Sequence, residues 1–325
     1  MAVVSYQKSK VVLQDNESVL QGLERLGEKI PSSCRSGACQ CCLMRAVAGA
    51  VPAKSQEGLK ETLKSQHYFL ACQCVPTEDL AVTLPADHAV PVYTAQVISK
   101  KQLNEEITSI RLSCPAGFRC RPGQYIQVMQ DSHIRSYSVA SLPIEDGFLE
   151  LHVRKIPGGS MSTWFHETCQ PGMQCSFRGP FGSCFYVPDA DRQFPILLVG
   201  TGSGLAPLEG IARDALQQEH EGPVVLIHGS LRESGLYHGN ELTALQSANK
   251  AFSYRTSVVE SGETESADIR QFAKSELTRL GAAGARIFLC GAPDLVNDLK
   301  VRLFLAGAAS SHIHCDPFII NAAST

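Results

Sequence analysis

The pattern of hydrophobic and polar positions changes twice along the chain. Before about residue 88, short alternating segments surround one helical stripe formed by Val19, Leu20, Leu23 and Leu26. The stripe predicts a helix over Ser18–Leu26 and the alternation predicts strands, so the first unit is expected to be α+β. The expected strands are Val3–Tyr6, Lys10–Leu13, Met44–Val47 and Leu80–Leu84.

The second region contains many short alternating segments separated by Gly and Pro turns, such as Arg121-Pro122-Gly123-Gln124. This pattern predicts an antiparallel β-barrel. The proline-bracketed stretch Pro85–Pro91 is the expected linker before it. The expected strands are Thr94–Ser99, Ile107–Leu112, Tyr125–Met129, Tyr137–Ala140, Phe148–Val153 and Met173–Phe177.

The third region begins after a second expected linker, Pro188–Phe194, and repeats the order strand, turn and helix. Its buried strands alternate with helices, which predicts an α/β unit with a parallel sheet. The predicted domains are therefore 1–88, 89–190 and 191–325. The expected strands of the third domain are Ile196–Val199, Val224–His228, Phe252–Val259 and Ile287–Leu289.

Composition narrows the class of protein. The 325 residues carry a net charge of −3, so no basic face is expected to attract nucleic acid or membrane. No apolar run approaches the roughly 18 residues that a bilayer span needs, and Met1–Lys10 does not resemble a secretory signal. We therefore expect a cytoplasmic protein. Its 13 cysteines favour a reducing compartment with thiolates on metal over a disulfide framework.

Four cysteines have metal-ligand spacing. Cys34, Cys39 and Cys42 form C-x₄-C-x₂-C, and Cys72 follows as a distant fourth thiolate. This is the spacing of a plant-type [2Fe–2S] site. Soft thiolates on a short loop suit iron–sulfur clusters, because the loop amides can point at the sulfurs. Gly37 allows the positive φ that such a loop needs.

Other interpretations of these cysteines stay open. Zinc also takes four thiolates, although its ligands usually come as two C-x₂₋₄-C pairs. Buried cysteines without any ligand are a second alternative. Within the cluster interpretation, Cys74 competes with Cys72 as the fourth ligand, and Cys41 lies between two ligands.

The cysteine segments resemble the ferredoxin module of bacterial oxygenase reductases. The loop from Cys34 is similar to the family's CRSGxCxxC, and Leu70-Ala71-Cys72-Gln73 is similar to its LACQ segment. The resemblance implies Cys72 as the fourth ligand. The chain departs from the family at Gln40, where Gly is frequent, and at Cys41, where a small or hydroxyl residue is common.

The barrel region resembles the flavin-binding domain of the ferredoxin reductase superfamily. Arg135-Ser136-Tyr137-Ser138 is similar to its RxYS/T motif. The resemblance implies that Arg135 meets the FAD pyrophosphate, Tyr137 packs on the isoalloxazine and Ser138 bonds near its N5. Ser136 is also expected to bind the cofactor. A guanidinium forks onto phosphate and an aromatic ring offers a stacking face. An ordinary exposed strand is the alternative.

A second flavin segment, Leu151–Ser162, resembles the family segment in which the backbone of His152, Val153 and Arg154 holds the flavin. Its Gly158-Gly159 turn is expected to open a helix at Ser162, where free amides form an anion site for the pyrophosphate. A plain flexible turn is the alternative. The expected contacts of this turn are Gly159, Met161 and Ser162.

The third region carries a G-x-G-x-G turn between a buried strand and a helix, which differs from the dinucleotide fingerprint G-x-G-x-x-G. It resembles the GTGxGxAP turn of the same superfamily, whose glycines let the nicotinamide nucleotide approach the backbone. The residues of this turn are Gly200, Thr201, Gly202, Ser203 and Gly204.

Two further segments agree with this resemblance. Cys290-Gly291-Ala292-Pro293 is similar to the family's CGPP turn, where the cysteine lies by the nicotinamide, although Cys290 could be a plain buried residue. Ile313–Phe318 is similar to the family ending IHxDxF, which implies that Asp316 and Phe318 lie near the flavin. The match argues against a metal pair at His312 and His314. Ser138, Cys290, Asp316 and Phe318 are thus the expected catalytic set.

Cofactor choice depends on the segment after the second strand of the third region. Ser230 and Arg232 lie where relatives contact the adenosine ribose. Relatives with this layout mostly use NADH, which is the expectation here, and Arg232 could meet the 2′-phosphate of NADPH.

Together the three regions imply a reductase. Hydride leaves nicotinamide as two electrons whereas an iron–sulfur cluster accepts one, so a flavin must stand between them. The resemblance covers nearly the full length and the domain order of the phenol hydroxylase, benzoate dioxygenase and methane monooxygenase reductases. The hypothesis is electron transfer from NADH to FAD to [2Fe–2S] to a terminal oxygenase component. The alternatives are the reductase of deoxysugar synthesis and a non-catalytic redox-sensing or zinc-binding interaction protein.

Overall fold

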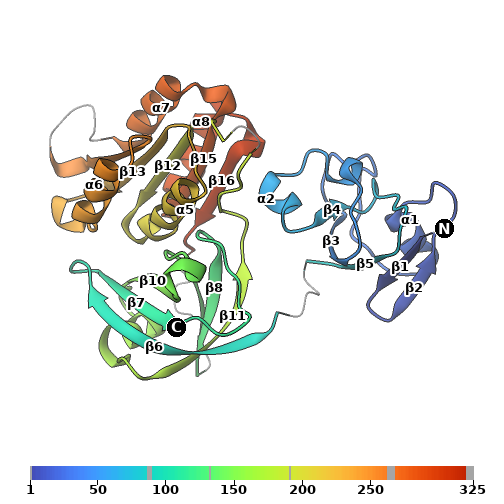
Figure 1. Ribbon diagram of the computed structural model, residues 1–325, viewed down its shortest axis with the longest axis horizontal. Coiled ribbons are helices and arrows are strands. Elements are labelled where there is room, and N and C mark those ends of the chain that lie inside the picture. The colour runs from blue at the N-terminus through green and yellow to red at the C-terminus, as the bar shows by residue number, and fades with distance from the viewer. Residues whose placement is uncertain (1, 86–89, 132, 190–191, 262–267, 320–325) are drawn as a thin grey trace. The chain divides into compact units, whose positions relative to one another are not determined.

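The structure, a computed structural model, describes residues 2–85, 90–131, 133–189, 192–261 and 268–319. The chain divides into two compact units, Met1–Val90 and Pro91–Thr325 (Figure 1). Residues 86–89 of the first predicted linker and 190–191 of the second lie outside the described residues. No helix in the described part of the chain is both long and apolar enough to cross a membrane.

The first unit is a five-stranded mixed sheet with one main helix. The sheet has the order β2-β1-β5-β3-β4, and β1 pairs antiparallel with β2 and parallel with β5. Helix α1 begins where predicted, because the Ser18 hydroxyl accepts a hydrogen bond from the Gln21 amide. The elements are β1 (Val3–Tyr6), β2 (Ser9–Val12), α1 (Val19–Arg25), β3 (Leu43–Ala48), α2 (Glu61–Lys64), β4 (Tyr68–Leu70) and β5 (Leu80–Thr83).

Two of these elements, α2 and β4, are absent from the sequence prediction. They contain four and three residues, which is too short to show a hydrophobic period. The core of the unit combines the helical stripe with the inner faces of the strands, including Leu20, Leu23, Met44 and Phe69.

The second unit begins with a six-stranded antiparallel sheet of order β10-β7-β6-β11-β8-β9. A bridge between Val139 and Leu151 joins the two edge strands, so the sheet closes on itself as the predicted barrel. The elements are β6 (Val92–Gln102), β7 (Ile107–Ser113), β8 (Tyr125–Gln130), β9 (His133–Ser138), α3 (Pro143–Asp146), β10 (Phe148–Arg154), α4 (Ser160–Thr163) and β11 (Gln174–Phe181).

Strand β9 differs from the prediction, which placed this strand at Tyr137–Ala140. The observed strand begins at His133, four residues earlier. Its first four residues are all exposed, so they show no alternation between apolar and polar positions. The sequence pattern could therefore not locate the beginning of β9.

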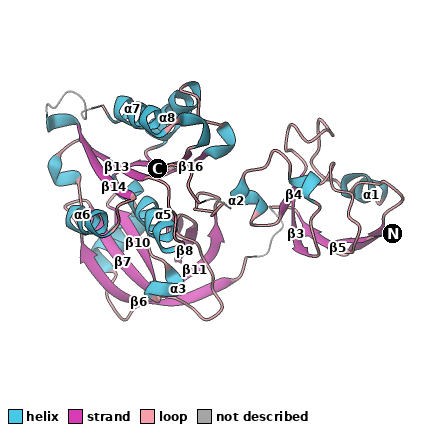
Figure 2. Cartoon of the chain, turned by 45° about the horizontal axis from the view of Figure 1, so that its top comes forward, coloured by secondary structure: helices cyan, strands magenta, loops and turns pink. Residues whose placement is uncertain are grey.

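The remainder of the second unit is the predicted parallel sheet, with strand order β14-β13-β12-β15-β16. Its fifth strand, β16, is not among the expected strands. Helices α5 and α6 pack on one face, and α7 and α8 pack on the other (Figure 2). The elements are β12 (Ile196–Thr201), α5 (Leu205–Gln217), β13 (Val224–Ser230), α6 (Gly239–Ala248), β14 (Phe252–Val258), α7 (Ile269–Leu280), β15 (Arg286–Gly291), α8 (Pro293–Leu305) and β16 (Ile313–Pro317).

Candidate functional site

The cysteine loop of the first unit brings Cys34 and Cys39 together. The backbone N–H groups of Ser36 and Cys39 lie 3.4 and 3.3 Å from Cys34 Sγ, and the Cys34 N–H lies 3.5 Å from Cys39 Sγ. Hydrogen bonds from the Ser36 side chain and from the Cys39 and Ser36 amides lower the pKa of Cys34 to about 6. The loop thus favours a thiolate at Cys34, the form that binds metal.

The other two predicted ligands form a second pair. Burial and the neighbouring Cys72 thiol raise the pKa of Cys42 to about 11 when no metal is bound. Among the described residues, no three His, Cys, Asp or Glu side chains converge on one point. Two cysteine pairs, Cys34 with Cys39 and Cys42 with Cys72, suit a two-iron cluster held by four thiolates.

Cys74 and Cys41 have different surroundings from these pairs. Cys74 is fully buried in the core of the unit, where burial raises its pKa to about 12. Cys41 is exposed and its thiol lies 3.8 Å from the Cys39 carbonyl. The Gln73 side chain, between Cys72 and Cys74, donates to the Arg35 carbonyl at 3.2 Å and lies 3.6 Å from Cys72 Sγ. Gln73 therefore ties the Cys72 segment to the cysteine loop.

Strand β9 presents an uncovered surface at the edge of the barrel sheet. Arg135 and Ser136 are exposed, and Ile134 keeps 41% of its surface accessible. Within the described residues, the Arg135 guanidinium donates only to the neighbouring Ile134 carbonyl, at 2.8 Å. Tyr137 is half-buried with its ring edge-on to Phe165 at 5.3 Å. An exposed guanidinium that, in the described part of the chain, bonds only to a neighbouring carbonyl and a half-buried aromatic ring on the same strand suit a flavin nucleotide.

In the second predicted flavin segment, the side chains of residues 152–154 are either buried or paired with another residue, so they are not available to a ligand on the uncovered surface of β9. His152 and Val153 are buried, and the exposed Arg154 pairs with Glu106. Helix α4 begins at Ser160 rather than at the predicted Ser162, and it spans only four residues. The prediction placed the helix start too late because the turn ends directly after Gly159, which adopts an extended conformation before the helix.

The side chains of Met161 and Ser162 are occupied within this turn. Met161 is 3% exposed, and the Ser162 hydroxyl accepts from the Ile156 amide at 3.1 Å and contacts the Gly159 carbonyl at 3.0 Å. Any contact from Met161 or Ser162 to a nucleotide must therefore use backbone amides.

Residues from three distant motifs meet where the barrel faces the parallel sheet. The Ser138 hydroxyl, at the end of β9, donates to Asp316 Oδ2 on β16 at 2.6 Å. Asp316 lies opposite Cys290 in the β15–β16 register, and the Phe318 N–H donates to the Gly291 carbonyl at 2.8 Å. All four residues of the expected catalytic set are thus in one place.

Burial is the main cause of the raised pKa values of Asp316 and Cys290 at this site. Burial raises the pKa of Asp316, against the opposing effect of the Ser138 hydrogen bond. Cys290 is fully buried, its pKa is raised well above the ordinary value, and its sulfur lies 3.9 Å from Cys184 Sγ. A neutral, buried thiol is a poor nucleophile, so the site favours a packing role for Cys290.

The glycine-rich turn follows β12. A Cβ at Gly204 would lie 2.4 Å from the Cys290 carbonyl, and one at Gly200 would lie 2.9 Å from it. These two glycines allow the turn to pack on β15. Gly202 differs, because its φ is +54° and, apart from its two chain neighbours, no described residue has an atom within 4 Å of where a Cβ would be. Within this turn, Gly202, with Thr201 and Ser203 beside it, is therefore the glycine whose bare backbone is open to a nucleotide.

Ser230 and Arg232 follow the end of β13. The Arg232 side chain is 72% exposed and pairs with Glu260 at 3.0 Å. The Arg232 N–H donates to the Ser230 hydroxyl at 3.4 Å. Sequence reasoning did not name Glu260, because no motif connects it to Arg232, which lies 28 positions earlier.

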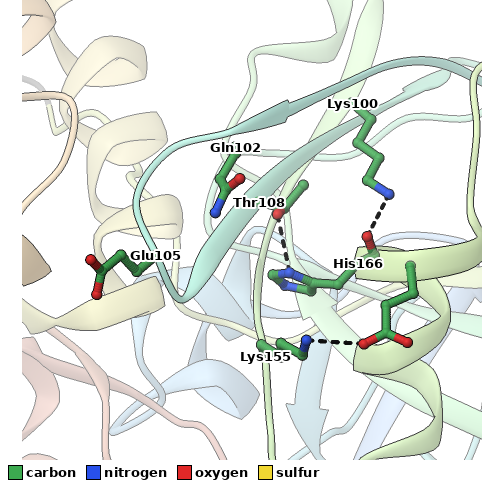
Figure 3. Close-up of a pocket in the computed structure, with 7 residues that line it drawn as sticks. Lys100, Gln102, Glu105, Thr108, Lys155 and His166 are labelled. Carbon is green, nitrogen blue, oxygen red and sulfur yellow. Dashed lines mark hydrogen bonds and ion pairs between the residues drawn. The ribbon is translucent and has the colours of Figure 1, made fainter.

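Two other features, a pair of histidines and a pocket in the barrel, do not belong to the predicted site. His314 stacks on Phe288 at 4.9 Å whereas His312 bonds to Arg286 at 2.7 Å, so these histidines do not form a metal pair. Figure 3 shows a pocket of about 240 Å³ in the barrel, where Lys100 donates to the His166 carbonyl. None of the predicted site residues lines this pocket, which is bounded by Lys100, Gln102, Glu105, Thr108, Lys155, His166 and Glu167.

Three family models match successive parts of the chain. The 2Fe-2S iron-sulfur cluster binding domain matches residues 4–77. The oxidoreductase FAD-binding domain matches residues 94–186, and the oxidoreductase NAD-binding domain matches residues 198–300.

Curated relatives share this order. The ferredoxin–NAD(P)⁺ reductase component of a naphthalene 1,2-dioxygenase system from Pseudomonas putida is 30% identical over 309 residues, which is 93% of each chain. The chain belongs to the three-module ferredoxin reductases. The electron transfer component of a xylene/toluene monooxygenase from Pseudomonas putida is 29% identical to this reductase, over 93% of the reductase and 89% of the relative.

Solved structures agree with the fold of the reductase. A cytochrome P450 reductase from Amycolatopsis has a TM-score of 0.63 at 25% identity, covering 98% of the reductase and 99% of that chain. A ferredoxin reductase of carbazole 1,9a-dioxygenase, at 23% identity and a TM-score of 0.63 over 98% of both chains, shows the fold alone.

Family membership confirms the expected cofactors. The reductase uses FAD and a [2Fe–2S] cluster, with NAD(P)H as the substrate. The cysteine pairs with their directed amides, the uncovered β9 strand and the open turn at Gly202 each fit the group that the family implies.

Proposed function

We propose that this reductase passes electrons from NADH through FAD and the [2Fe–2S] cluster to the terminal component of a multicomponent oxygenase. The observation that carries the proposal is the 2.6 Å hydrogen bond between Ser138 and Asp316. This bond joins β9, which carries the flavin motif, to β16, the last strand of the parallel sheet. Asp316 lies next to Cys290 there. The relatives named above act in aromatic dioxygenase and monooxygenase systems, which supports the proposed acceptor.

Bound FAD accepts hydride from NADH and releases electrons one at a time to an iron–sulfur cluster. In the proposal, the exposed Arg135 binds the FAD pyrophosphate and Tyr137 packs against the isoalloxazine. The amides of Gly159, Met161 and Ser162 and the backbone of His152–Arg154 complete the flavin contacts. Ser138 reaches its hydrogen-bonding position near the flavin because Asp316 fixes its hydroxyl.

The nicotinamide nucleotide is proposed to lie along the turn Gly200–Gly204 and to contact Ser230 and Gly291. Cys290 packs on Cys184, and the Phe318 N–H bonds to Gly291. Both residues are proposed to help keep water away from the nicotinamide. Such positioning is the protein's main contribution to hydride transfer, since reacting atoms must be held close and aligned.

NADH is proposed over NADPH because of Glu260. A 2′-phosphate near Arg232 would meet the carboxylate that already pairs with this arginine. The carboxylate repels the phosphate and competes for the guanidinium.

Cys34, Cys39, Cys42 and Cys72 are proposed as the cluster ligands, two for each iron. The amides directed at Cys34 support this choice, as does the burial of Cys74 in the core. A cluster with four thiolate ligands is maintained in a reducing compartment, which supports a cytoplasmic location.

The test compares two acceptors in the full chain and in a variant that lacks residues 1–88. Each unit has its own hydrophobic core, so the shortened chain is expected to fold. The variant should keep NADH-driven ferricyanide reduction and lose reduction of cytochrome c and of oxygenase partners. Cytochrome c reduction at the full rate by the shortened chain would refute the electron order. Turnover with a deoxysugar-pathway acceptor but with no oxygenase component would instead favour that second class of reductase.

A further inference from the structure

A tyrosine outside every recognised motif connects the two nucleotide segments of the second unit. Tyr237 lies between β13 and α6 and is only 5% exposed. Its hydroxyl is 3.1 Å from His152 Nδ1 on β10 and 3.3 Å from the carbonyl oxygen of Gly202. One phenol oxygen therefore bridges the strand assigned to the flavin and the turn assigned to nicotinamide.

The chemistry of the three groups fixes the direction of both hydrogen bonds. A carbonyl oxygen can only accept, so the Tyr237 O–H donates to Gly202. The phenol oxygen then accepts from a proton on His152 Nδ1. Burial raises the pKa of Tyr237 well above its ordinary value, so the donor proton stays in place at every working pH.

The segment that carries Tyr237 is held on several sides. The Asn104 side-chain amide, from the β6–β7 connection, donates to the Gly235 carbonyl at 3.0 Å. His238, which directly follows Tyr237 in the chain, bonds through Nδ1 to Glu209 of α5 at 2.8 Å. The rings of His152, His228 and His238 pack edge-on against Tyr237, with centroids 5.2 to 5.4 Å away. A hydroxyl so confined can hold its partner at a fixed position.

The bonded carbonyl belongs to the one glycine of the turn that faces open space. Gly200 and Gly204 are fixed by their packing on Cys290, whereas, apart from its two chain neighbours, no described residue has an atom within 4 Å of a Cβ built at Gly202. The backbone at Gly202 also adopts a positive φ of 54°, in the left-handed region that favours glycine. The Gly202 carbonyl already accepts from the Leu205 N–H at the end of the turn, and the Tyr237 hydroxyl adds a side-chain bond from outside the turn.

We propose that Tyr237 is a positioning residue for hydride transfer, which holds the Gly202 carbonyl, and with it the nicotinamide-binding turn, at a fixed position relative to strand β10. The inference rests on the proposed function, since it takes the turn as the nicotinamide site and β10 as part of the flavin site. Hydride transfer is sensitive to small misplacement of the reacting groups, so loss of the Tyr237 bond lowers the rate of transfer more than nucleotide affinity.

The test uses the full-length, FAD-loaded reductase under anaerobic conditions with rapid mixing against NADH. Tyr237→Phe keeps the ring and removes the hydroxyl. The limiting rate constant of flavin reduction should fall roughly 3- to 10-fold, the value of one lost hydrogen bond, while the NADH concentration for half-maximal rate changes less. The long-wavelength charge-transfer absorbance of the nicotinamide–flavin complex should weaken in parallel. FAD content and unfolding temperature should stay near those of the wild type.

The matched control is Tyr254→Phe. Tyr254 is a partly buried tyrosine whose hydroxyl faces a histidine, His228 at 3.4 Å, but within the described residues no bond joins it to the turn. Its flavin reduction should equal that of the wild type. Asn104→Asp is a second probe, because it keeps the acceptor for the Glu106 and Ile107 amides and removes the donor to Gly235. It should lower the same rate constant by a smaller factor, even if Tyr237→Phe fails to fold.

The outcomes separate this inference from the proposed function. A wild type whose flavin is reduced rapidly, together with an unchanged rate in Tyr237→Phe, overturns the positioning role alone. An equal loss in Tyr254→Phe also overturns it, because the effect is then general. A wild type that neither NADH nor NADPH reduces overturns the proposed function itself, and the positioning role with it.

Discussion

The cysteine loop and the place where Ser138 meets Asp316 differ in how their residues are gathered. Three of the four proposed cluster ligands lie within nine residues, and amides of the same loop point at the sulfurs of Cys34 and Cys39. Ser138 and Asp316 lie 178 positions apart and meet only because the barrel and the parallel sheet pack together. The first site depends on local backbone geometry, and the second depends on the packing of two domains. Substitutions should therefore abolish the first outright and alter the second by degrees.

The largest expected effect is at the fourth cluster ligand. Cys72→Ser should lose the cluster and most bound iron, because a hydroxyl is a poor ligand for it. Cys74→Ser, the matched change two residues away, should keep the iron and instead lose about 1 kcal/mol of stability, since it buries a hydroxyl in the core. Iron and sulfide analysis with thermal unfolding checks both variants. Equal iron content in the two proteins would contradict the choice of Cys72.

The next effect is on flavin retention. Arg135→Ala should weaken FAD binding roughly tenfold or more, the value of a hydrogen bond to a charged group. Arg119→Ala is the control, because Arg119 is also exposed on the barrel domain and also donates to the carbonyl of the residue before it. Fluorescence titration with FAD measures both affinities. Identical affinities in the two variants would remove the pyrophosphate role of Arg135.

A smaller, pH-dependent effect is expected at Asp316. Burial holds the pKa of this carboxyl above its ordinary value of 3.8. The protonated form is therefore favoured more strongly in the folded state than in the unfolded state. The stability that this preference contributes is fully present below pH 3.8 and is lost as pH rises through the raised pKa. Asp316→Asn, neutral at every pH, should show a smaller loss of stability between pH 4 and pH 8 than the wild type.

The same variant should be slower. Without the carboxyl oxygen that accepts from the Ser138 hydroxyl, flavin reduction by NADH should fall about tenfold. Urea unfolding across pH, together with rapid-mixing kinetics, checks the two halves of this prediction. A variant that is both as fast as the wild type and equally pH-sensitive would show that the Ser138–Asp316 bond is structural only.

The smallest effect is expected at the exposed Arg232–Glu260 pair. Glu260→Gln should improve the use of NADPH by a few fold, because a surface ion pair is worth at most about 1 kcal/mol. Arg232→Ala should not improve it. The ratio of kcat/KM for NADPH and NADH measures the change, and an unchanged ratio in Glu260→Gln would leave cofactor choice to other residues.

The same contrast explains what could be read from the sequence. The spacing of Cys34, Cys39 and Cys42 predicts three of the four cluster ligands, because a short loop necessarily keeps its cysteines close together. The motifs also named Ser138, Cys290 and Asp316. Nothing in the sequence revealed that Ser138 bonds to Asp316, since such a contact depends on how two domains pack.

Other features escaped prediction for definite physical reasons. The beginning of β9 has no alternation because all its first residues are exposed. Strand β4 is too short to show a period. Tyr237 belongs to no motif, and its signal was only an aromatic residue just before a helix. His152 was expected to act through its backbone, and the structure adds a side-chain bond to Tyr237.

The most direct test of the account is an anaerobic titration with NADH, followed by visible absorbance and electron paramagnetic resonance. The account predicts that flavin absorbance bleaches and that the signal of a reduced [2Fe–2S] cluster grows in the same sample. It also predicts that Cys72→Ser shows the bleaching without the signal. A wild-type protein that contains iron and sulfide, and whose flavin bleaches while no cluster signal forms, would contradict it.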